Sequence, residues 1–437
     1  MSDALLFSIV GGAFVVMLFA GYYIHSILLV VGVGGIYLLE GPEILNGLLG
    51  PQPFGRTASY ALTTIPLFVV MAQFVLQADI VKDLFYLVNK VSRSRRGMLG
   101  TLTLGAGAML GAVSGSGIAT AASLGQVAVP ELDKHGYRPE LAGAVAAAAG
   151  ALSGIIPPSL VLILYGVATE TPIGDLFIAA IIPGLLVTAS FVVSMMFYLR
   201  RSGRSADDVL DGSMELEHVP VRRLLVAMAV SAAIVVIVFG GIYSGFVTPT
   251  EAGAFGAFSA FVAALLLGKV NATFLRTSLL ETVKVTAMVM LILIGAQIFG
   301  RFISLSLLPR RLIDLLEPVV ETPLLMLFIL AVVFFVLFMF IEGAAVILMS
   351  VPVVLPIIEA MDTDIVWFGV FIAVICTVGL ITPPVGLSVY AVSGATGIAP
   401  DGMFRIATGF AVLATVLVCG LLVAFPQLAL WLPGVAG

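Results

Sequence analysis

Two pairs of adjacent prolines interrupt two of the most apolar stretches of this sequence, at positions 157–158 and 383–384. Proline has no backbone N–H, and its ring clashes with the carbonyl group four residues earlier, so each pair frees two carbonyl oxygens of the preceding helix. The freed carbonyls belong to Ser153 and Gly154 before Pro157 and Pro158, and to Gly379 and Leu380 before Pro383 and Pro384. Carbonyl oxygens are hard ligands that suit a small cation, whereas nearby half-helix N-termini favour an anion.

An internal repeat gives both proline pairs the same surroundings. One constant offset of 226 residues superposes Pro130 on Pro356 and the first proline pair on the second. The same offset lays Ser116 over Glu342. Residues 98–130 leave one basic loop and return to another, and they are too short for two membrane spans of about 20 residues each. We therefore expect a re-entrant hairpin here and its equivalent at residues 323–355.

Each hairpin tip should face one broken helix, at residues 141–168 in the first copy and 365–393 in the second. Paired prolines can also merely kink a helix, but two copies at one spacing from a hairpin favour a functional break. The expected ligands of the first cation site are Ser114, Gly115, Ser116, Ser153, Ile156 and Pro158. The expected ligands of the second are Gly343, Thr377, Gly379, Leu380 and Thr382.

The composition places these motifs in a membrane. Of the 437 residues, 61% are hydrophobic and 10% are charged, and the mean hydropathy is +1.19, which excludes a water-facing globule. Apolar runs of spanning length recur from end to end and are too long for barrel strands. The N-terminus carries an acidic residue and no basic region, so it predicts a first membrane helix rather than a cleaved leader. The fold class is an all-α polytopic membrane protein.

Basic residues set the orientation. They cluster at 91–97, 133–138, 199–204 and 221–223, which predicts that these loops face the cytoplasm. Counting passes from there places the opening of the second hairpin outside, where the loop EAMDTD has no Lys or Arg. The two copies are therefore inverted, as in secondary transporters with a midplane site built from discontinuous helices.

This organisation divides the chain into six segments. They are N-terminal scaffold helices (1–56), a first inverted repeat (57–200), a cytoplasmic linker (201–223), further scaffold helices (224–280), a second inverted repeat (281–405) and a C-terminal helix (406–437).

The long stretch from GSGIATAASLGQVAVPELDKHGYRPE to IIPPSLVLILYGVATETPIGDLF resembles the large membrane subunit of TRAP transporters, the tripartite ATP-independent periplasmic family. TPTEAGAFGAF and LITPPVGLSVYAVSGATGI extend the similarity over essentially the whole chain. The resemblance implies an elevator-type importer of organic anions in the bacterial inner membrane, driven by sodium ions that bind at the two cation sites. It also implies two partners, a periplasmic substrate-binding protein and a small membrane subunit. The second hairpin tip, FIEGAAV, departs from the serine-rich first tip, so its ion shell must depend more on backbone and threonine oxygens.

Charges inside the membrane point to the substrate. Arg301 and Glu342 lie in apolar surroundings, and an intramembrane ionisable residue suggests a functional site. Arg301 could bind a carboxylate through its planar fork, reach the external interface beside Arg310, or pair with Glu342. Ser116 and Thr120 are further candidates for hydrogen bonds to the substrate, although such residues often serve only as contacts between helices.

Several alternatives stay open. A stand-alone sodium-coupled anion transporter would have the same repeats but no binding protein. An intramembrane enzyme would need a base beside Ser116, and the sequence offers none, so no catalytic residue is expected. No organic cofactor and no nucleic-acid partner are expected either. The small subunit is expected to be a separate chain, because residue 1 is followed at once by the first helix. Glu251, after Thr248, is expected to cap a helix. The sequence does not distinguish between a dicarboxylate, a sialic acid and another carboxylate or sulfonate as the substrate.

Overall fold

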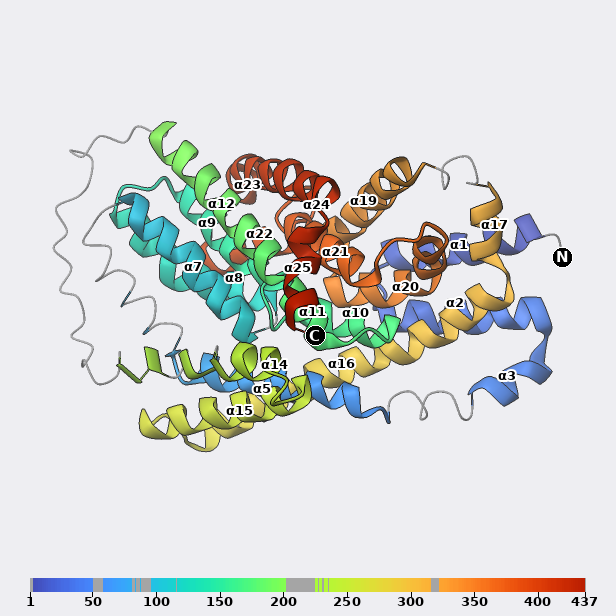
Figure 1. Ribbon diagram of the computed structural model, residues 1–437, viewed down its shortest axis with the longest axis horizontal. Coiled ribbons are helices and arrows are strands. Elements are labelled where there is room, and N and C mark those ends of the chain that lie inside the picture. Colours follow the sequence, from blue (N-terminus) through green and yellow to red (C-terminus); the bar gives the residue numbers. More distant parts are fainter. Residues whose placement is uncertain are drawn as a thin grey trace.

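The computed structural model describes residues 3–49, 58–80, 83, 87, 96–114, 116–201, 225–226, 228–229, 232–234, 236–315 and 322–436. Within these ranges every regular element is a helix (Figure 1). Seven of the described helical segments are long and apolar enough to cross a membrane. The fold is therefore the expected all-α membrane architecture.

The helices of the first half of the chain are α1 (Asp3–Phe19), α2 (Ile24–Glu40), α3 (Pro42–Leu49), η1 (Tyr60–Thr63), α5 (Thr64–Gln77), α7 (Arg96–Ser114), α8 (Gly117–Lys134), α9 (Pro139–Ala151), η2 (Leu152–Gly154), α10 (Leu160–Thr169), α11 (Ile173–Ala179) and α12 (Ile181–Arg201). Those of the second half are η4 (Val236–Gly240), α14 (Gly241–Tyr243), α15 (Pro249–Leu266), α16 (Ala272–Leu305), α17 (Leu308–Leu315), α19 (Pro323–Phe340), α20 (Gly343–Ala360), α21 (Ile365–Gly379), α22 (Leu387–Thr396), α23 (Pro400–Ala414), η5 (Thr415–Cys419), α24 (Gly420–Ala424) and α25 (Gln427–Ala436).

The repeat read from the sequence appears in the helix boundaries. The second arms of the two hairpins, α8 and α20, begin and end 226 residues apart, and so do the starts of α9 and α21. The peptide bonds between Pro157 and Pro158 and between Pro383 and Pro384 are both cis. The two halves thus share one succession of hairpin arm, tip, hairpin arm and broken helix.

The turns repeat as well as the helices. Among the described residues, ten of the eleven with a positive φ angle pair across the two halves with spacings of 224–228 residues. The pairs are Gly21 with Gly245, Gly41 with Gly268, Asp79 with Leu307, Gly136 with Asp362, and Glu170 with Gly397. Three of these turns join helices outside the hairpins and broken helices, so the scaffold helices follow the same spacing.

The helices form two layers. A scaffold layer contains α2, α5, α15 and α16, in which α2 packs along α16 and α15 packs along α5. A hairpin layer contains α7 to α12 and α19 to α25, and Figure 1 shows α7, α8, α9 and α23 above α5 and α15. The layers touch where α5 meets α7 and where α16 meets α20. The first contact is made by the first arm of one hairpin, α7, and the second by the second arm of the other, α20.

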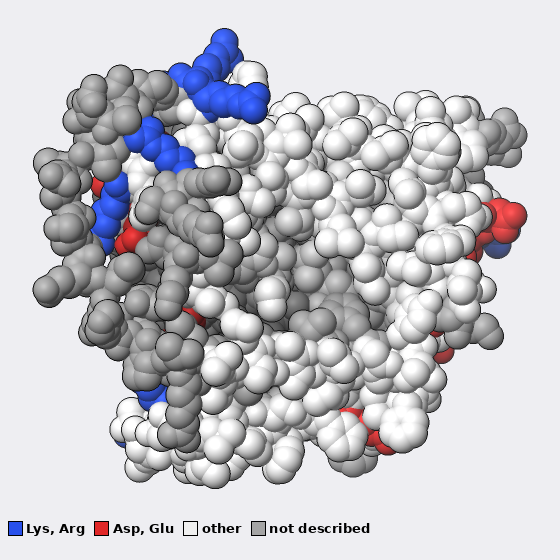
Figure 2. All heavy atoms as spheres, turned by 60° about the vertical axis from the view of Figure 1, so that its left-hand side comes forward, with Lys and Arg blue, Asp and Glu red and all other residues white. Residues whose placement is uncertain are grey.

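Basic side chains mark one end of the molecule. The first turn of α7, the last turn of α8 and the last turn of α12 carry Arg96, Lys134, and Arg200 with Arg201. Figure 2 shows most of the visible Lys and Arg side chains toward one end, the left-hand end of Figure 1. By the positive-inside rule this end faces the cytoplasm. The proposed linker at 201–223 lies outside the described residues apart from Arg201.

Helix α9 forms the centre of the hairpin layer. Every residue from Leu141 to Ala151 is buried, and most are alanine or glycine. Small side chains allow backbones to approach closely, as is usual between membrane helices. A Cβ atom added to Gly150 would lie 2.5 Å from the backbone nitrogen of Ala121 on α8. The first hairpin is therefore held directly against the helix that leads into the first break.

Candidate functional site

The first hairpin ends in a capped helix start. Ser116 is the N-cap of α8, and its Oγ accepts a hydrogen bond of 3.4 Å from Ala119 N–H. Thr120, one turn further along α8, is buried, and its N–H donates to the carbonyl of Ser116 at 3.1 Å. The backbone of Ser114 ends α7, whereas Gly115 lies outside the described residues. Ser116 and Thr120 thus lie within one turn of the tip.

The cytoplasmic base of this hairpin is fastened by Tyr137. Its hydroxyl donates a 2.7 Å hydrogen bond to the carbonyl of Arg96, the first residue of α7. Burial raises the pKa of the Tyr137 phenol above its usual value, which already keeps the group protonated at physiological pH. The loop after the hairpin is therefore tied back to its beginning, which fixes the direction in which the tip points.

The first break frees fewer carbonyls than the prolines alone indicate. Helix α9 passes into η2, and α10 restarts after the prolines, with Ser159 as its N-cap. The Ser159 hydroxyl donates a 2.8 Å hydrogen bond to the carbonyl of Gly154, and its oxygen accepts from Leu162 N–H at 3.5 Å. The Gly154 carbonyl therefore has a partner, with one lone pair left for a ligand. Ser153 is buried beside it.

The second break is held by backbone groups. The carbonyl of Gly379 accepts from Thr382 N–H at 3.1 Å, and the carbonyl of Leu380 accepts from Ser388 N–H at 3.0 Å. The hydroxyls of Thr377 and Thr382 donate to carbonyls of their own helical turns, at 2.9 and 2.6 Å. Their oxygens keep lone pairs that could bind a cation.

The two hairpin tips and the two breaks meet around one small cavity of about 30 Å³. Its wall combines residues from both repeats: Ser116, Gly117, Ile118, Ser153, Gly154, Leu160, Val161, Glu342, Gly343, Ala344, Cys376 and Leu380. The second arm of each hairpin packs on the broken helix of the other repeat, α8 on α22 and α20 on α10. The two candidate cation sites are therefore neighbours rather than separate pockets.

Close backbone approaches hold this crossing together. A Cβ atom on Gly154 would lie 2.9 Å from Thr377 Oγ1, and one on Gly117 would lie 3.2 Å from Ser153 Oγ. Gly343 is equally restricted, with Cys376 Sγ at 2.9 Å from its added Cβ. Ile156 and Pro158 lie in the first break, and Thr382 is buried in the second, but none of the three lines the cavity.

Two serines at the breaks were missed by the sequence argument. Ser159 follows the first proline pair directly, and a serine there is a usual N-cap signal for the restarting helix. Ser388 lies just after the second break; it is fully buried, and its Oγ has no hydrogen-bond partner within the described residues. A buried hydroxyl without a partner is costly, so Ser388 is a candidate ligand or water-binding group. Nothing in the sequence distinguishes Ser388 from a packing serine.

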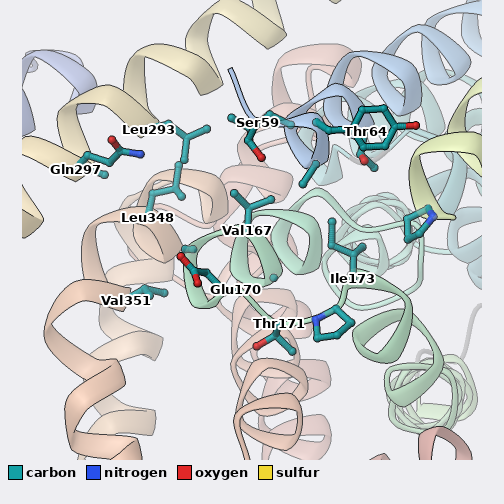
Figure 3. Close-up of a pocket in the computed structure, with 18 of the residues that line it drawn as sticks. Ser59, Thr64, Val167, Glu170, Thr171, Ile173, Leu293, Gln297, Leu348 and Val351 are labelled. Carbon is teal, nitrogen blue, oxygen red and sulfur yellow. The ribbon is translucent and has the colours of Figure 1, made fainter. Parts of the chain in front are cut away.

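A second cavity, of about 1100 Å³, lies between the two layers. Figure 3 shows Leu293 and Gln297 of α16, Leu348 and Val351 of α20, and Glu170 after α10 around it. Arg301 lines this cavity, whereas Glu342 lines the small one. The structure therefore brings Glu342 and Ser116 together and leaves Arg301 apart from them.

Thr248 and Glu251 form the capping box expected at the start of α15: Thr248 Oγ1 accepts from Glu251 N–H at 3.3 Å, and Glu251 Oε2 accepts from Thr248 N–H at 2.8 Å. The role of Glu251 as a cap is confirmed. Cys376 and Cys419 are buried free thiols. No cluster of His, Cys, Asp or Glu among the described residues could hold a metal ion.

Inverted repeats, re-entrant hairpins and two broken helices around a common cavity define a secondary membrane transporter. A sequence model of the tripartite ATP-independent periplasmic transporter, DctM component, matches residues 11–428. The chain belongs to this family and is a large permease subunit of the inner membrane, not an enzyme.

The chain is similar to a sialic acid TRAP transporter large permease protein of Vibrio cholerae, with 30% identity over 95% of this chain and 96% of that one. It is also 30% identical to a C4-dicarboxylate TRAP transporter large permease protein of Pseudomonas aeruginosa, over 92% of each chain. The crystal structure of the YdaH transporter of Alcanivorax borkumensis has a similar fold. Its TM-score is 0.63 at 16% identity, covering 93% of this chain and 98% of that one.

Proposed function

We propose that this protein imports an organic anion across the bacterial inner membrane by sodium symport. Family membership and the names of its relatives, which refer to sialic acid and C4-dicarboxylates, support a carboxylate substrate. A sulfonate has the same charge and is a second possible substrate. Sodium and substrate move inward together, so the sodium gradient drives uptake.

The observation that carries this proposal is the small cavity between the hairpin tips and the breaks. A volume of about 30 Å³ holds a single ion or water molecule and is far too small for an organic anion. The polar residues in its otherwise apolar wall are Ser116, Ser153 and Glu342, whose hydroxyl and carboxylate oxygens are hard donors. These donors suit sodium in both predicted sites, and Ser388 adds one more hydroxyl at the second break.

The anion then binds at the outer edge of the hairpin tips. Ser116 offers a hydroxyl group there, with Thr120 buried one turn further along α8, and the N-termini of α8 and α20 contribute positive partial charge. Sodium in the adjacent cavity neutralises Glu342 and favours the anion, which couples the two binding events. Arg301 contributes from the scaffold layer.

The transport movement is a displacement of the hairpin layer against the scaffold layer. The contact between α16 and α20 includes Gly300 opposite Pro352, a small residue facing an apolar one without a hydrogen bond, which permits sliding. A periplasmic substrate-binding protein delivers the anion, and a small membrane subunit completes the tripartite assembly in the lipid.

The test is uptake into proteoliposomes that contain this chain with its small subunit. The neighbouring binding protein is added with a radiolabelled carboxylate, with and without an inward sodium gradient. The proposal requires uptake that needs both sodium and the binding protein. Sodium-driven uptake that is indifferent to the binding protein would identify a stand-alone symporter instead. Uptake that is indifferent to sodium would refute the assignment of the small cavity.

A further inference from the structure

Arg301 lies in the scaffold layer without an ionic partner in the described part of the chain. It lines the large cavity on the same face of α16 as Gln297, one turn earlier, and its side chain is exposed there. The hairpin cavity, where Glu342 lies, does not include it. A guanidinium group that faces a cavity within the membrane without a counter-ion suggests that its anion arrives only in another state.

The contact between α16 and α20 gives the distance along the helix axis between Arg301 and the second hairpin tip. A Cβ atom added to Gly300 would lie 3.1 Å from Pro352 Cβ, so these residues are level with each other. Glu342 is ten residues before Pro352, at the start of α20. With a rise of 1.5 Å per residue, the hairpin tip lies about 15 Å from the level of Arg301. Since α20 runs from the tip toward the external loop, the tip lies on the cytoplasmic side of Arg301.

We propose that Arg301 is the external half of the substrate site. This inference rests on the proposed sliding of the hairpin layer. When that layer moves outward by about 15 Å along α16, the tip with Glu342 becomes level with Arg301. The guanidinium then offers two parallel N–H donors to the carboxylate or sulfonate group of the substrate. In the state described here, the tip lies to the cytoplasmic side of Arg301 and does not contact it.

The repeat-equivalent position on the cytoplasmic side of the scaffold is uncharged. Helix α5 is the repeat counterpart of the second half of α16, and MAQF at 71–74 corresponds to GAQI at 295–298. Gln73 and Gln77 occupy the positions that Gln297 and Arg301 occupy on α16, and Gln77 is the exposed last residue of α5. The neutral amide of Gln77 therefore lies toward the cytoplasmic side, at the position equivalent to the cationic Arg301 on the external side. The site binds its anion more tightly when it faces outward.

Paired cysteines on α16 and α20 test the distance. In a C376A/C419A background, Gly300→Cys with Pro352→Cys reports the state described here, and Arg301→Cys with Glu342→Cys reports the outward one. A disulfide needs Cα atoms within about 7 Å. We expect the first pair to cross-link as it stands, the second to cross-link only when the outward state is populated, and each cross-link to prevent the other. A 300–352 cross-link without any 301–342 cross-link across sodium and substrate conditions would overturn the proposal.

Transport from the two sides tests the charge. Arg301→Gln should raise the half-saturating substrate concentration from the external side about 10- to 100-fold, because a charge-assisted hydrogen-bond pair is lost. It should leave that concentration unchanged from the cytoplasmic side, whereas Gln77→Arg should lower it there. Arg310→Gln, which lies outside both cavities, is the matched control.

An equal effect of Arg301→Gln from both sides would overturn the proposal, because the arginine would then belong to the site in every state. The absence of an effect from either side would also overturn it. Wild-type protein without sodium-driven uptake would refute the proposed function itself. Normal wild-type uptake with the wrong cross-linking or sidedness refutes only the role given to Arg301.

Discussion

Replacing Gly150 with alanine should force the first hairpin away from the first break. The added Cβ would lie 2.5 Å from Ala121 N and 2.6 Å from Ala121 Cα, both backbone atoms of α8. Favourable contacts lie at about 3.5–4.0 Å, so the two helices must separate by about 1 Å. Overpacking costs about 1–3 kcal/mol, and alanine regains about 0.5–1 kcal/mol of helix propensity. We expect a net loss of roughly 1–2 kcal/mol of folding free energy.

Gly105→Ala is the matched control for this substitution. Gly105 lies in α7 of the same hairpin, and among the described residues no atom beyond its chain neighbours and its own helical backbone lies within 4 Å of its added Cβ, so it gains the same helix propensity without a clash. The assay is thermal unfolding in detergent, followed by sodium titration of uptake. Gly150→Ala should lower the melting midpoint by on the order of 2 °C, and Gly105→Ala should not.

The sodium titration separates a local effect from a general loss of stability. Moving α8 away from α9 increases the distance from Ser116 to Ser153 across the small cavity, so Gly150→Ala should also need more sodium for half-maximal uptake. If Gly150→Ala matched Gly105→Ala in both midpoint and sodium dependence, the close packing of α8 on α9 would be wrong. The assignment of the cavity to sodium would then lose its geometric basis.

Three further substitutions follow from the same structure. Ser153→Ala should raise the half-maximal sodium concentration, whereas Ser190→Ala, whose hydroxyl only bonds the carbonyl of Val187 in its own helix at 2.7 Å, should not. Ser388→Ala removes a buried hydroxyl without a partner in the described residues, so thermal unfolding should show unchanged or higher stability while sodium dependence shifts. Thr248→Ala breaks the capping box and should cost about 1 kcal/mol in the same unfolding assay, with Ser259→Ala in the same helix as control.

Much of the architecture was predictable because it is encoded locally. Proline acts on its own helix, so two proline pairs at one spacing predict two breaks, and the 226-residue offset predicts the boundaries of α8 and α20. Partners of individual groups depend on tertiary contacts. The hydroxyl of Ser159 takes a lone pair of the Gly154 carbonyl, which the spacing of the prolines does not reveal.

The position of Arg301 shows a second limit. Sequence order places Arg301 and Glu342 in the same repeat and suggests one site, but they belong to different layers. The position of the hairpin layer along the scaffold layer changes during the transport cycle. The same sequence adopts every state of that cycle, so it does not indicate which position the structure shows. The separation of about 15 Å could come only from a contact between the layers, such as Gly300 against Pro352.

The carbonyl groups at the two helix breaks are bonded by different donors, and this difference has a consequence for ion binding. At the first, the side chain of Ser159 caps the restarting helix and bonds the freed Gly154 carbonyl. At the second, the equivalent cap is Gly386, which has no side chain, so backbone N–H groups of Gly386 and Ser388 bond the carbonyls of Met339 and Leu380 instead. Ser388 therefore keeps its hydroxyl for a ligand. The second hairpin tip carries a glutamate and lacks the serines of the first tip. Ser388 can supply the second cation site with the hydroxyl oxygen that those serines would have provided.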